Sequence, residues 1–202
     1  MKGNMKQKNG SKNKNGAKKR TASSAPKRMS QKTNSAQARN GNAMDATELL
    51  MQDHENVQGL FAQFERARED AQKKMMLFEK IKNELQMHTK VEEEIFYPAV
   101  EELPIDRAKD DIERSIQDHE EVDALLDELQ ALSPDDGDFD ERMTELMDAV
   151  RSHIQLEHDE VFKVARAGLG EEKLEELGRE MQEFKQSMKE GKMDSQGAEA
   201  SE

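Results

Sequence analysis

A histidine and a glutamate stand four residues apart among apolar residues, His88 and Glu92, in the segment HTKVEEEIFYP (88–98). Four residues make about one helical turn, so both side chains would share the apolar face of a helix. A second pair with the same spacing, His153 and Glu157, follows further along the chain. Imidazole and carboxylate groups that meet on a buried face are typical metal ligands. On a solvent-exposed face the same pair would not indicate a metal site.

The two pairs belong to an internal repeat with a shift of 65 residues, which carries the first pair onto the second. The motif QDHE at 52–55 returns as QDHE at 117–120 and adds two further histidines, His54 and His119. Because every residue of ligand type recurs, the repeat indicates two related helical hairpins.

Four amphipathic helices must position these residues. Apolar residues recur at intervals of three and four from Asp45 onward, and Asp45 with Glu48 predicts a capping box at the first helix start. No segment alternates with period two, and the connections are short, as in the turn SPDDGD (133–138). The sequence therefore predicts an all-α, up-down-up-down four-helix bundle. The predicted inward stripes are Leu50, His54, Val57, Phe61 and Phe64; Phe78, Ile81, Leu85, His88, Glu92, Ile95 and Ala99; Ile112, Ile116, His119, Val122, Leu126 and Leu129; and Phe139, Met143, Leu146, Val150, His153, Glu157, Val161 and Val164.

Further boundaries come from proline, glycine and polarity. Pro98 is expected to kink or end the second helix, and Gly168 to close the fourth. A fifth helix is predicted by the stripe Leu174, Leu177, Met181, Phe184 and Met188, which packs across the bundle or, as the alternative, forms a dimer contact. We divide the chain into a basic tail (1–44), a bundle with the additional helix (45–190) and a polar, disordered tail (191–202).

The four histidines are expected to meet at one height of the bundle. His54 and His88 are equally far from residue 71, near the first connection, and His119 and His153 are equally far from residue 136, inside the turn. His88 and His119 likewise flank the connection at 103–104. Helices that run in alternate directions between these connections bring all four rings into one layer.

This layer would contain four imidazoles and two carboxylates. Two unpaired carboxylates in an apolar core would each cost several kcal/mol, unless they stayed protonated, and cations remove that penalty. Six ligands suit two metal ions that take two imidazoles each and share the carboxylates. Iron, manganese and zinc all fit such ligands. The alternative is a buried polar layer that fixes the helix register without a metal.

Composition limits the other possibilities. The chain has no cysteine, so a metal site must use nitrogen and oxygen ligands, and the absence of disulfides fits a reducing cytoplasm. No apolar run is as long as a membrane span, and the amino-terminal residues lack the apolar core of a secretion signal. We therefore expect a cytoplasmic protein without membrane contact.

Residues 1–44 have a composition of their own. They hold nine Lys and three Arg with no Asp or Glu, a charge of +12 in a chain whose net charge is -13, and they contain no Leu, Ile, Val or Phe. Too little apolar surface is available to offset the entropy of ordering, so this tail is predicted to be disordered. It is either a solubilising tail or a tether to nucleic acid through charge contacts, although no aromatic residue is present to stack on bases.

From about Asp45 to Phe184 the chain resembles the hemerythrin-like HHE cation-binding family, through the two QDHE motifs and HTKVEEEIFYP (88–98). The resemblance implies a four-helix bundle with a non-heme di-iron centre that takes dioxygen at an open iron position. Related members bind oxygen, sense oxygen or iron, respond to nitric oxide, or act on peroxide. The family's ligands, including the two bridging carboxylates, carry over to His54, His88, Glu92, His119, His153 and Glu157.

The sequence departs from the oxygen-carrying members at one position. Those have a second histidine one turn after the first on the third helix, where this chain has Asp123. Fewer nitrogen ligands argue against stable, reversible oxygen carriage. Asp123 is either a seventh ligand or a solvated residue on the helix surface.

Other polar residues near the ligands are expected outside the metal shell. His158 lies five residues after its ligand histidine, about 140° around the helix, and is expected beside the ligands or at the surface. Tyr97 has the same spacing from its ligand glutamate and is expected to pack in the core. Glu93 and Glu94 are expected mostly on a solvated face.

Three functions remain open. The first is a protein that binds or senses oxygen, nitric oxide or iron without turnover. The second is an enzyme that decomposes peroxide or oxidises iron, and the third is a nucleic-acid-associated protein placed by residues 1–44. A ferritin-like site is disfavoured, because such sites use Glu-x-x-His rather than a histidine followed by a glutamate four residues later. Since no motif supplies a substrate pocket or an organic cofactor, binding is favoured over catalysis.

Overall fold

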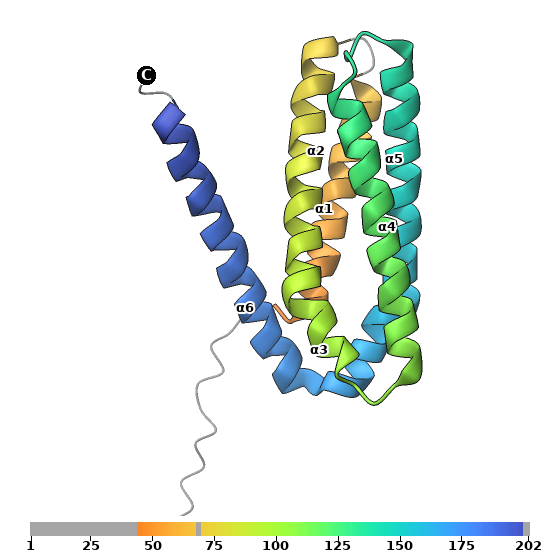
Figure 1. Cartoon of the computed structure of the whole chain (residues 1–202), viewed down its shortest axis with the longest axis vertical. Coiled ribbons are helices and arrows are strands. Elements are labelled where there is room, and N and C mark those ends of the chain that lie inside the picture. Colours follow the sequence, from red (N-terminus) through yellow and green to blue (C-terminus); the bar gives the residue numbers. More distant parts are fainter. Residues whose placement is uncertain (1–43, 68–69, 200–202) are drawn as a thin grey trace, which may run out of the picture. The chain divides into compact units, whose positions relative to one another are not determined.

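The computed structural model describes residues 44–67 and 70–199, with side chains as far as Gly191. The predicted basic tail therefore lies outside the described residues, apart from Met44. Helices dominate the described residues, which contain no strand (Figure 1). In chain order the elements are α1 (Ala46–Arg66), α2 (Ala71–Val91), η1 (Glu92–Phe96), α3 (Tyr97–Glu101), α4 (Asp106–Gln130), α5 (Gly137–Leu156), η2 (Glu157–Val161) and α6 (Phe162–Glu199).

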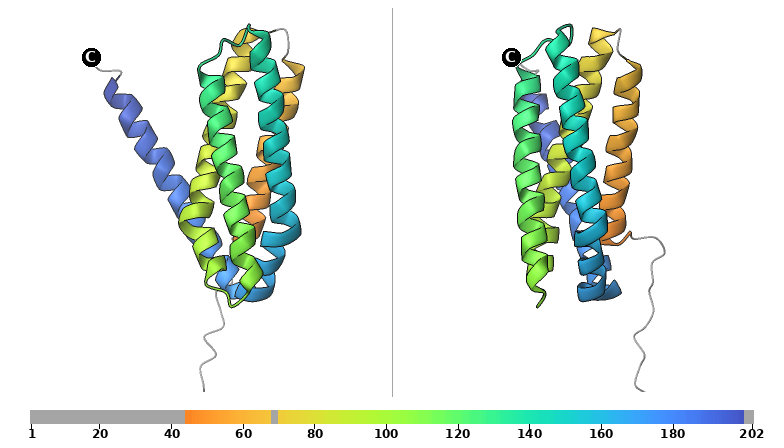
Figure 2. Two further views of the ribbon diagram at one scale, coloured as in Figure 1. Left: turned by 45° about the vertical axis from the view of Figure 1, so that its right-hand side comes forward. Right: turned by 90° about the vertical axis from the view of Figure 1, so that its right-hand side faces the viewer.

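Four long helices, α1, α2, α4 and α5, lie side by side and run in alternate directions (Figures 1 and 2). Within the bundle, α1 pairs with α2 and α4 pairs with α5, so each predicted hairpin is a unit. This confirms the up-down-up-down four-helix bundle. The first helix begins as predicted, because the Asp45 carboxylate accepts the Glu48 amide at 2.9 Å and Glu48 accepts the Asp45 amide at 3.2 Å.

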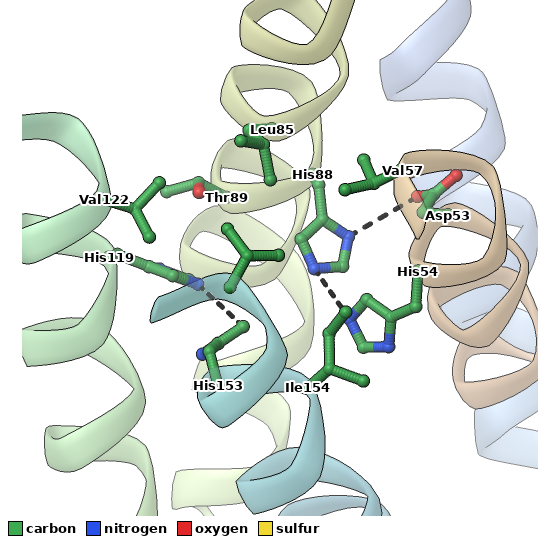
Figure 3. Close-up of a pocket in the computed structure, with 11 residues that line it drawn as sticks. Asp53, His54, Val57, Leu85, His88, Thr89, His119, Val122, His153 and Ile154 are labelled. Carbon is green, nitrogen blue, oxygen red and sulfur yellow. Dashed lines mark hydrogen bonds and ion pairs between the residues drawn. The ribbon is translucent and has the colours of Figure 1, made fainter. Parts of the chain in front are cut away.

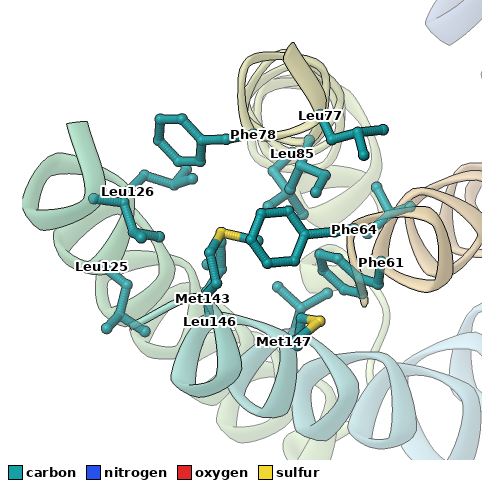
Figure 4. Packing of buried hydrophobic residues seen from close by; sticks show 14 of the residues in the cluster. Phe61, Phe64, Leu77, Phe78, Leu85, Leu125, Leu126, Met143, Leu146 and Met147 are labelled. Atoms are coloured by element: carbon teal, nitrogen blue, oxygen red, sulfur yellow. The ribbon is translucent and has the colours of Figure 1, made fainter. Parts of the chain in front are cut away.

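The core consists of two apolar clusters. One fills the half of the bundle that includes the α1–α2 and α4–α5 turns, where Phe61, Phe64, Phe78 and Phe139 are buried (Figure 4). The other fills the opposite half and includes Leu50, Val91, Ile112 and side chains of α6. The polar residues of the four stripes lie between these clusters, so the bundle holds them away from water from both sides.

Two short π-helical segments interrupt the regular helices. The first, η1, begins at Glu92, and the second, η2, begins at Glu157, the equivalent position of the repeat. A π turn adds one residue to the helix and is often found at functional sites. The sequence predicted neither segment. Pro98 was expected to kink or end the second helix. It does not end the helix, because it lies in the first turn of α3, directly after η1, where the missing backbone N–H of proline is tolerated.

The helix α6 changes direction at Gly170, whose φ of 77° is left-handed and suits glycine. The predicted break at Gly168 is thus displaced by two residues. Beyond the break, Leu174, Leu177 and Met181 are buried against α1, which confirms the predicted packing on the bundle. Helical backbone continues to Glu199, past the predicted start of a polar tail at residue 191.

Gly178 is where α6 approaches the beginning of α1 most closely. A Cβ at this position would clash with the backbone of Met44 and Asp45, whereas a Cβ at the exposed Gly59 of α1 would meet nothing. Ala favours a helix over Gly by up to about 1 kcal/mol. We therefore expect Gly59→Ala to stabilise the protein by about that amount and Gly178→Ala to destabilise it, as measured by urea unfolding. Equal stabilisation by both would show that α6 does not dock this closely.

Candidate metal centre

All six predicted ligand residues lie in one buried layer, between the two apolar clusters. The four histidines are each 4% exposed and the two glutamates are fully buried. Each helix of the bundle contributes one imidazole, and the rings of adjacent helices face each other in pairs (Figure 3). The six residues are His54 (α1), His88 (α2), Glu92 (η1), His119 (α4), His153 (α5) and Glu157 (η2).

The imidazoles form two pairs, one within each hairpin. His54 Nε2 lies 3.0 Å from His88 Nε2, and His119 Nε2 lies 3.3 Å from His153 Nε2. These nitrogens point at each other within each pair. The arrangement is the one expected of two imidazoles that share a cation.

Each carboxylate lies between the two histidine pairs. Glu92 Oε2 is 3.2 Å from His88 Nε2 and 3.3 Å from His119 Nε2. Glu157 Oε2 is 3.1 Å from His54 Nε2 and 3.4 Å from His153 Nε2. One carboxylate oxygen of each glutamate can therefore serve both pairs.

A compact group of five of these residues could hold a metal ion, since one ligand atom from each lies within 4.8 Å of all the others. His119 stands just outside this group, although its Nε2 is in contact with Glu92 and His153. One buried oxygen within the layer also lacks a partner, because Glu92 Oε1 forms no hydrogen bond with any described residue. Unpartnered buried carboxylate oxygens are costly without a cation, so the residues present fit a metal.

Protonation differs between the two glutamates. Burial and the charge of Glu157 raise the pKa of Glu92 well above its usual range. Burial would also raise the pKa of Glu157, but the charge and hydrogen bond of His153, together with His54, hold it well below its usual range. When no ion is bound, these opposite shifts favour a proton on Glu92 and a negative charge on Glu157.

The histidines differ in the same way. Burial lowers the pKa of His88 to about 4, and burial and the charge of His153 lower that of His119. Burial would lower the pKa of His153 too, but Glu157 and Asp118 raise it to about 9. One imidazolium and one carboxylate would thus compensate each other in the layer when no ion is bound.

A second layer of contacts repeats with the same shift of 65 residues. Asp53 Oδ2 lies 3.6 Å from His88 Nδ1, and Asp118 Oδ2 lies 3.8 Å from His153 Nδ1. These are the aspartates of the two QDHE motifs, and such outer contacts orient metal-binding imidazoles. Sequence analysis noted the motifs without assigning the aspartates a role, although their recurrence beside the ligands was a usable signal.

The other two histidines also have outer partners at equivalent positions. His119 Nδ1 contacts Glu93 Oε1 at 2.9 Å, and His54 Nδ1 contacts His158 Nε2 at 3.1 Å. His158 therefore lies beside the ligands, as expected. Glu93 is exposed as expected, although its carboxylate also contacts His119. Asp123 is exposed and contributes no atom to the metal-binding group.

Tyr97 is buried in the core as expected, but its expected position away from the ligand face was wrong. Its buried hydroxyl donates to Glu157 Oε1 at 2.9 Å and lies 3.4 Å from Glu92 Oε2. The π turn of η1 explains the error, since its extra residue rotates Tyr97 back toward the face of Glu92.

Removing the Tyr97 hydroxyl should weaken the metal-free protein. In Tyr97→Phe, the ionised Glu157 loses a buried hydrogen bond, which costs about 1–3 kcal/mol. Urea unfolding of metal-free wild type and variant measures the difference. A loss below about 0.5 kcal/mol would contradict a hydrogen bond to an ionised carboxylate.

A small closed cavity adjoins the imidazoles. Its volume is about 20 Å³, enough for about one water-sized molecule. All four histidines line it, and the remaining wall is mostly aliphatic, from Val57, Leu85, Val122, Val150 and Ile154 (Figure 3). Thr89 lines this cavity and also a surface hollow of about 290 Å³ that includes Glu93, Asp123 and Met188.

A four-helix bundle with one histidine per helix and two shared glutamates in a single buried layer defines a metal-binding bundle protein. The hemerythrin HHE cation-binding domain family matches residues 45–165. The chain belongs to this family. Among the described residues, no helix combines the length and apolar character needed to cross a bilayer.

Two known proteins are similar to this chain. A hemerythrin HHE cation-binding domain-containing protein of Mycobacterium kansasii has the same fold, with a TM-score of 0.62 at 21% identity over 71% of this chain and 89% of that one. A DNA nickase of Nostoc sp. (strain PCC 7120) is 28% identical over 142 residues, 70% of this chain. The chain spans only 39% of the length of that relative.

Proposed function

We propose that this protein holds two iron ions in the histidine–glutamate layer and binds a small gaseous ligand, dioxygen or nitric oxide, as a sensor. His54 and His88 would hold one ion and His119 and His153 the other, with Glu92 and Glu157 shared. Bound iron supplies redox chemistry and open coordination positions. Manganese and zinc fit the same nitrogen and oxygen ligands and are the alternatives to iron.

The proposal of a gaseous ligand is supported by the cavity of about 20 Å³ beside all four imidazoles. Pockets for organic ligands usually have volumes of about 300–1,000 Å³, so the cavity admits only very small molecules. Its aliphatic wall disfavours water and favours an uncharged diatomic molecule. Thr89 lines both the cavity and the surface hollow, so such a ligand would enter past Thr89.

The test is anaerobic loading of the full chain with Fe²⁺, followed by metal analysis and optical spectroscopy before and after exposure to air or nitric oxide. About two irons per chain and a reversible spectral change support the proposal. Retention of less than one iron per chain would reject the iron site. Sustained consumption of added peroxide or Fe²⁺ would favour the enzyme that acts on peroxide or oxidises iron.

A second candidate, contact with nucleic acid, is favoured by two observations. One relative is described as a DNA nickase, and residues 1–44 carry twelve positive charges and no negative ones. Charge contacts with DNA weaken steeply as salt is raised. Salt-sensitive DNA binding that disappears when residues 1–44 are removed would support this function, and nicking of supercoiled DNA by the iron-loaded chain would make it catalytic. Equal binding by full and shortened chains would reject a role for the tail.

A further inference from the structure

The fifth helix reaches the candidate metal centre through a buried ion pair. Lys185 of α6 places its Nζ 2.5 Å and 2.6 Å from the two carboxylate oxygens of Asp53 on α1. The side chains of Lys185 and Asp53 are only 13% and 7% exposed. Lys185 continues the stripe of Leu177 and Met181, so the contact is part of the docked face of α6.

Asp53 in turn faces a ligand of the centre. Its Oδ2 lies 3.6 Å from His88 Nδ1, and among the described residues no hydrogen bond satisfies that nitrogen. Asp53 is therefore the carboxylate placed to orient the His88 ring through its Nδ1 atom. A carboxylate held by both oxygens on a lysine cannot rotate toward water, so Lys185 restrains His88 through Asp53.

The other half of the centre has no such restraint. At the equivalent position of the repeat, Asp118 faces His153 Nδ1 at 3.8 Å. The Asp118 side chain is 33% exposed, and no lysine or arginine of the described residues forms an ion pair with it. The two hairpins thus match in their ligands but differ in what holds the outer aspartate.

We propose that Lys185 is a positioning residue that holds Asp53 against His88 and makes the His54–His88 half of the centre the tighter metal position. The inference rests on the proposed two-metal function. Lys185 lies beyond residues 45–165, the part of the chain that the family match covers. Because coupling between two sites is reciprocal, a metal ion at His54 and His88 also strengthens the docking of α6 on α1.

Lys185→Met tests this on the full chain, since Met keeps the apolar stem and removes the charge. Metal-free wild type and variant are titrated anaerobically with Fe²⁺, and the same samples are followed by amide hydrogen exchange across residues 174–190. Loss of an outer contact to a metal-binding histidine typically lowers affinity about 10–100-fold. We expect that loss for one of the two ions only, together with loss of the metal-dependent protection of α6.

Two controls make the result specific. Lys189→Met, which removes an exposed charge one turn further along α6, should change neither affinity. In an Asp53→Asn background, Lys185→Met should have no further effect on metal affinity, because Lys185 acts through Asp53. Lys185→Arg, which restores a cation, should recover most of the lost affinity.

The outcomes separate this inference from the proposed function. If the wild type binds fewer than two metal ions, the proposed function itself fails. If the wild type binds two and Lys185→Met binds both with unchanged affinity, only the role of Lys185 is rejected. An equal loss at both positions, or an undiminished effect in the Asp53→Asn background, also rejects it. Thermal unfolding confirms that the variants are folded, and Lys185→Gln replaces Lys185→Met if the latter is not.

Discussion

Replacing Glu92 by Gln should abolish binding of the two proposed iron ions while leaving the metal-free protein about as stable as the wild type. Glu92 Oε2 touches one histidine of each pair, so its loss would affect both proposed metal positions. Burial and the charge of Glu157 raise the pKa of Glu92 well above its usual range, which favours a neutral side chain when no ion is bound. An amide of the same shape therefore changes little in the fold. The decrease in metal affinity should exceed the 10–100-fold typical of outer contacts.

Glu157→Gln should behave differently despite its equivalent position in the repeat. It also touches both pairs and should also abolish metal binding. Glu157 is ionised, however, and its charge compensates that of His153. Removing one partner of a buried ion pair costs about 3–5 kcal/mol, so the metal-free variant should be much less stable.

Metal analysis after anaerobic loading and urea unfolding of the metal-free forms measure both effects. Glu94→Gln is the matched control, since this exposed neighbour in η1 makes no contact with the imidazoles. Retention of both irons by Glu92→Gln would show that the carboxylate is not shared. Equal stabilities of the two metal-free variants would show that the proton is not held on Glu92 in preference to Glu157.

Raising the pH from 6.5 to 9 should weaken the metal-free fold and strengthen metal binding. His153 has a pKa of about 9 in the folded protein against 6.5 when unfolded. Over this range the folded state holds a proton that the unfolded chain has lost, so the free energy of unfolding falls as the pH rises. The loss from His153 is about 3 kcal/mol, and the raised pKa of Glu92 acts in the same direction. The lowered pKa values of His88 and His119 act in the opposite direction near pH 6.5 and offset part of this loss.

Metal ions require the same groups without their protons, so binding should release protons and tighten as the pH rises. Urea unfolding of metal-free protein at several pH values, and Zn²⁺ titrations in weak buffer at pH 7, measure the two effects. His153→Gln should flatten the alkaline fall in stability. A metal-free protein that becomes more stable between pH 6.5 and 9 would contradict the placement of these protons.

The bundle and the convergence of the six residues could be predicted because both depend on regular periodicity. Because helices of similar length lie on either side of short connections, the four histidines must lie at the same height of the bundle. The structure brings all six histidine and glutamate residues together. Their role as ligands remains a prediction. The family and the fold agree with the sequence pattern, and the coarser expectation of a metal site fits the group of histidines and glutamates.

What could not be predicted depends on departures from that periodicity and on contacts distant in sequence. No residue preference predicts a π turn. A regular α-helix without the π turn of η1 would place Tyr97 on the wrong face. Glu93 is a solvated residue by any pattern, and only the three-dimensional structure shows that its carboxylate turns to His119. Lys185 meets Asp53 across 132 residues because α6 folds back at Gly170, a direction that sequence spacing does not encode.

The paired π turns also decide where the residues after each glutamate point. Both begin at the shared glutamate, at positions that the repeat makes equivalent. Each extra residue rotates the side chains that follow it around the helix axis, and in η1 this brings Tyr97 to the two glutamates. The outer contacts of the two halves are nevertheless different, with a carboxylate from Glu93 on one side and an imidazole from His158 on the other. The two halves therefore combine one backbone geometry with two kinds of outer partner.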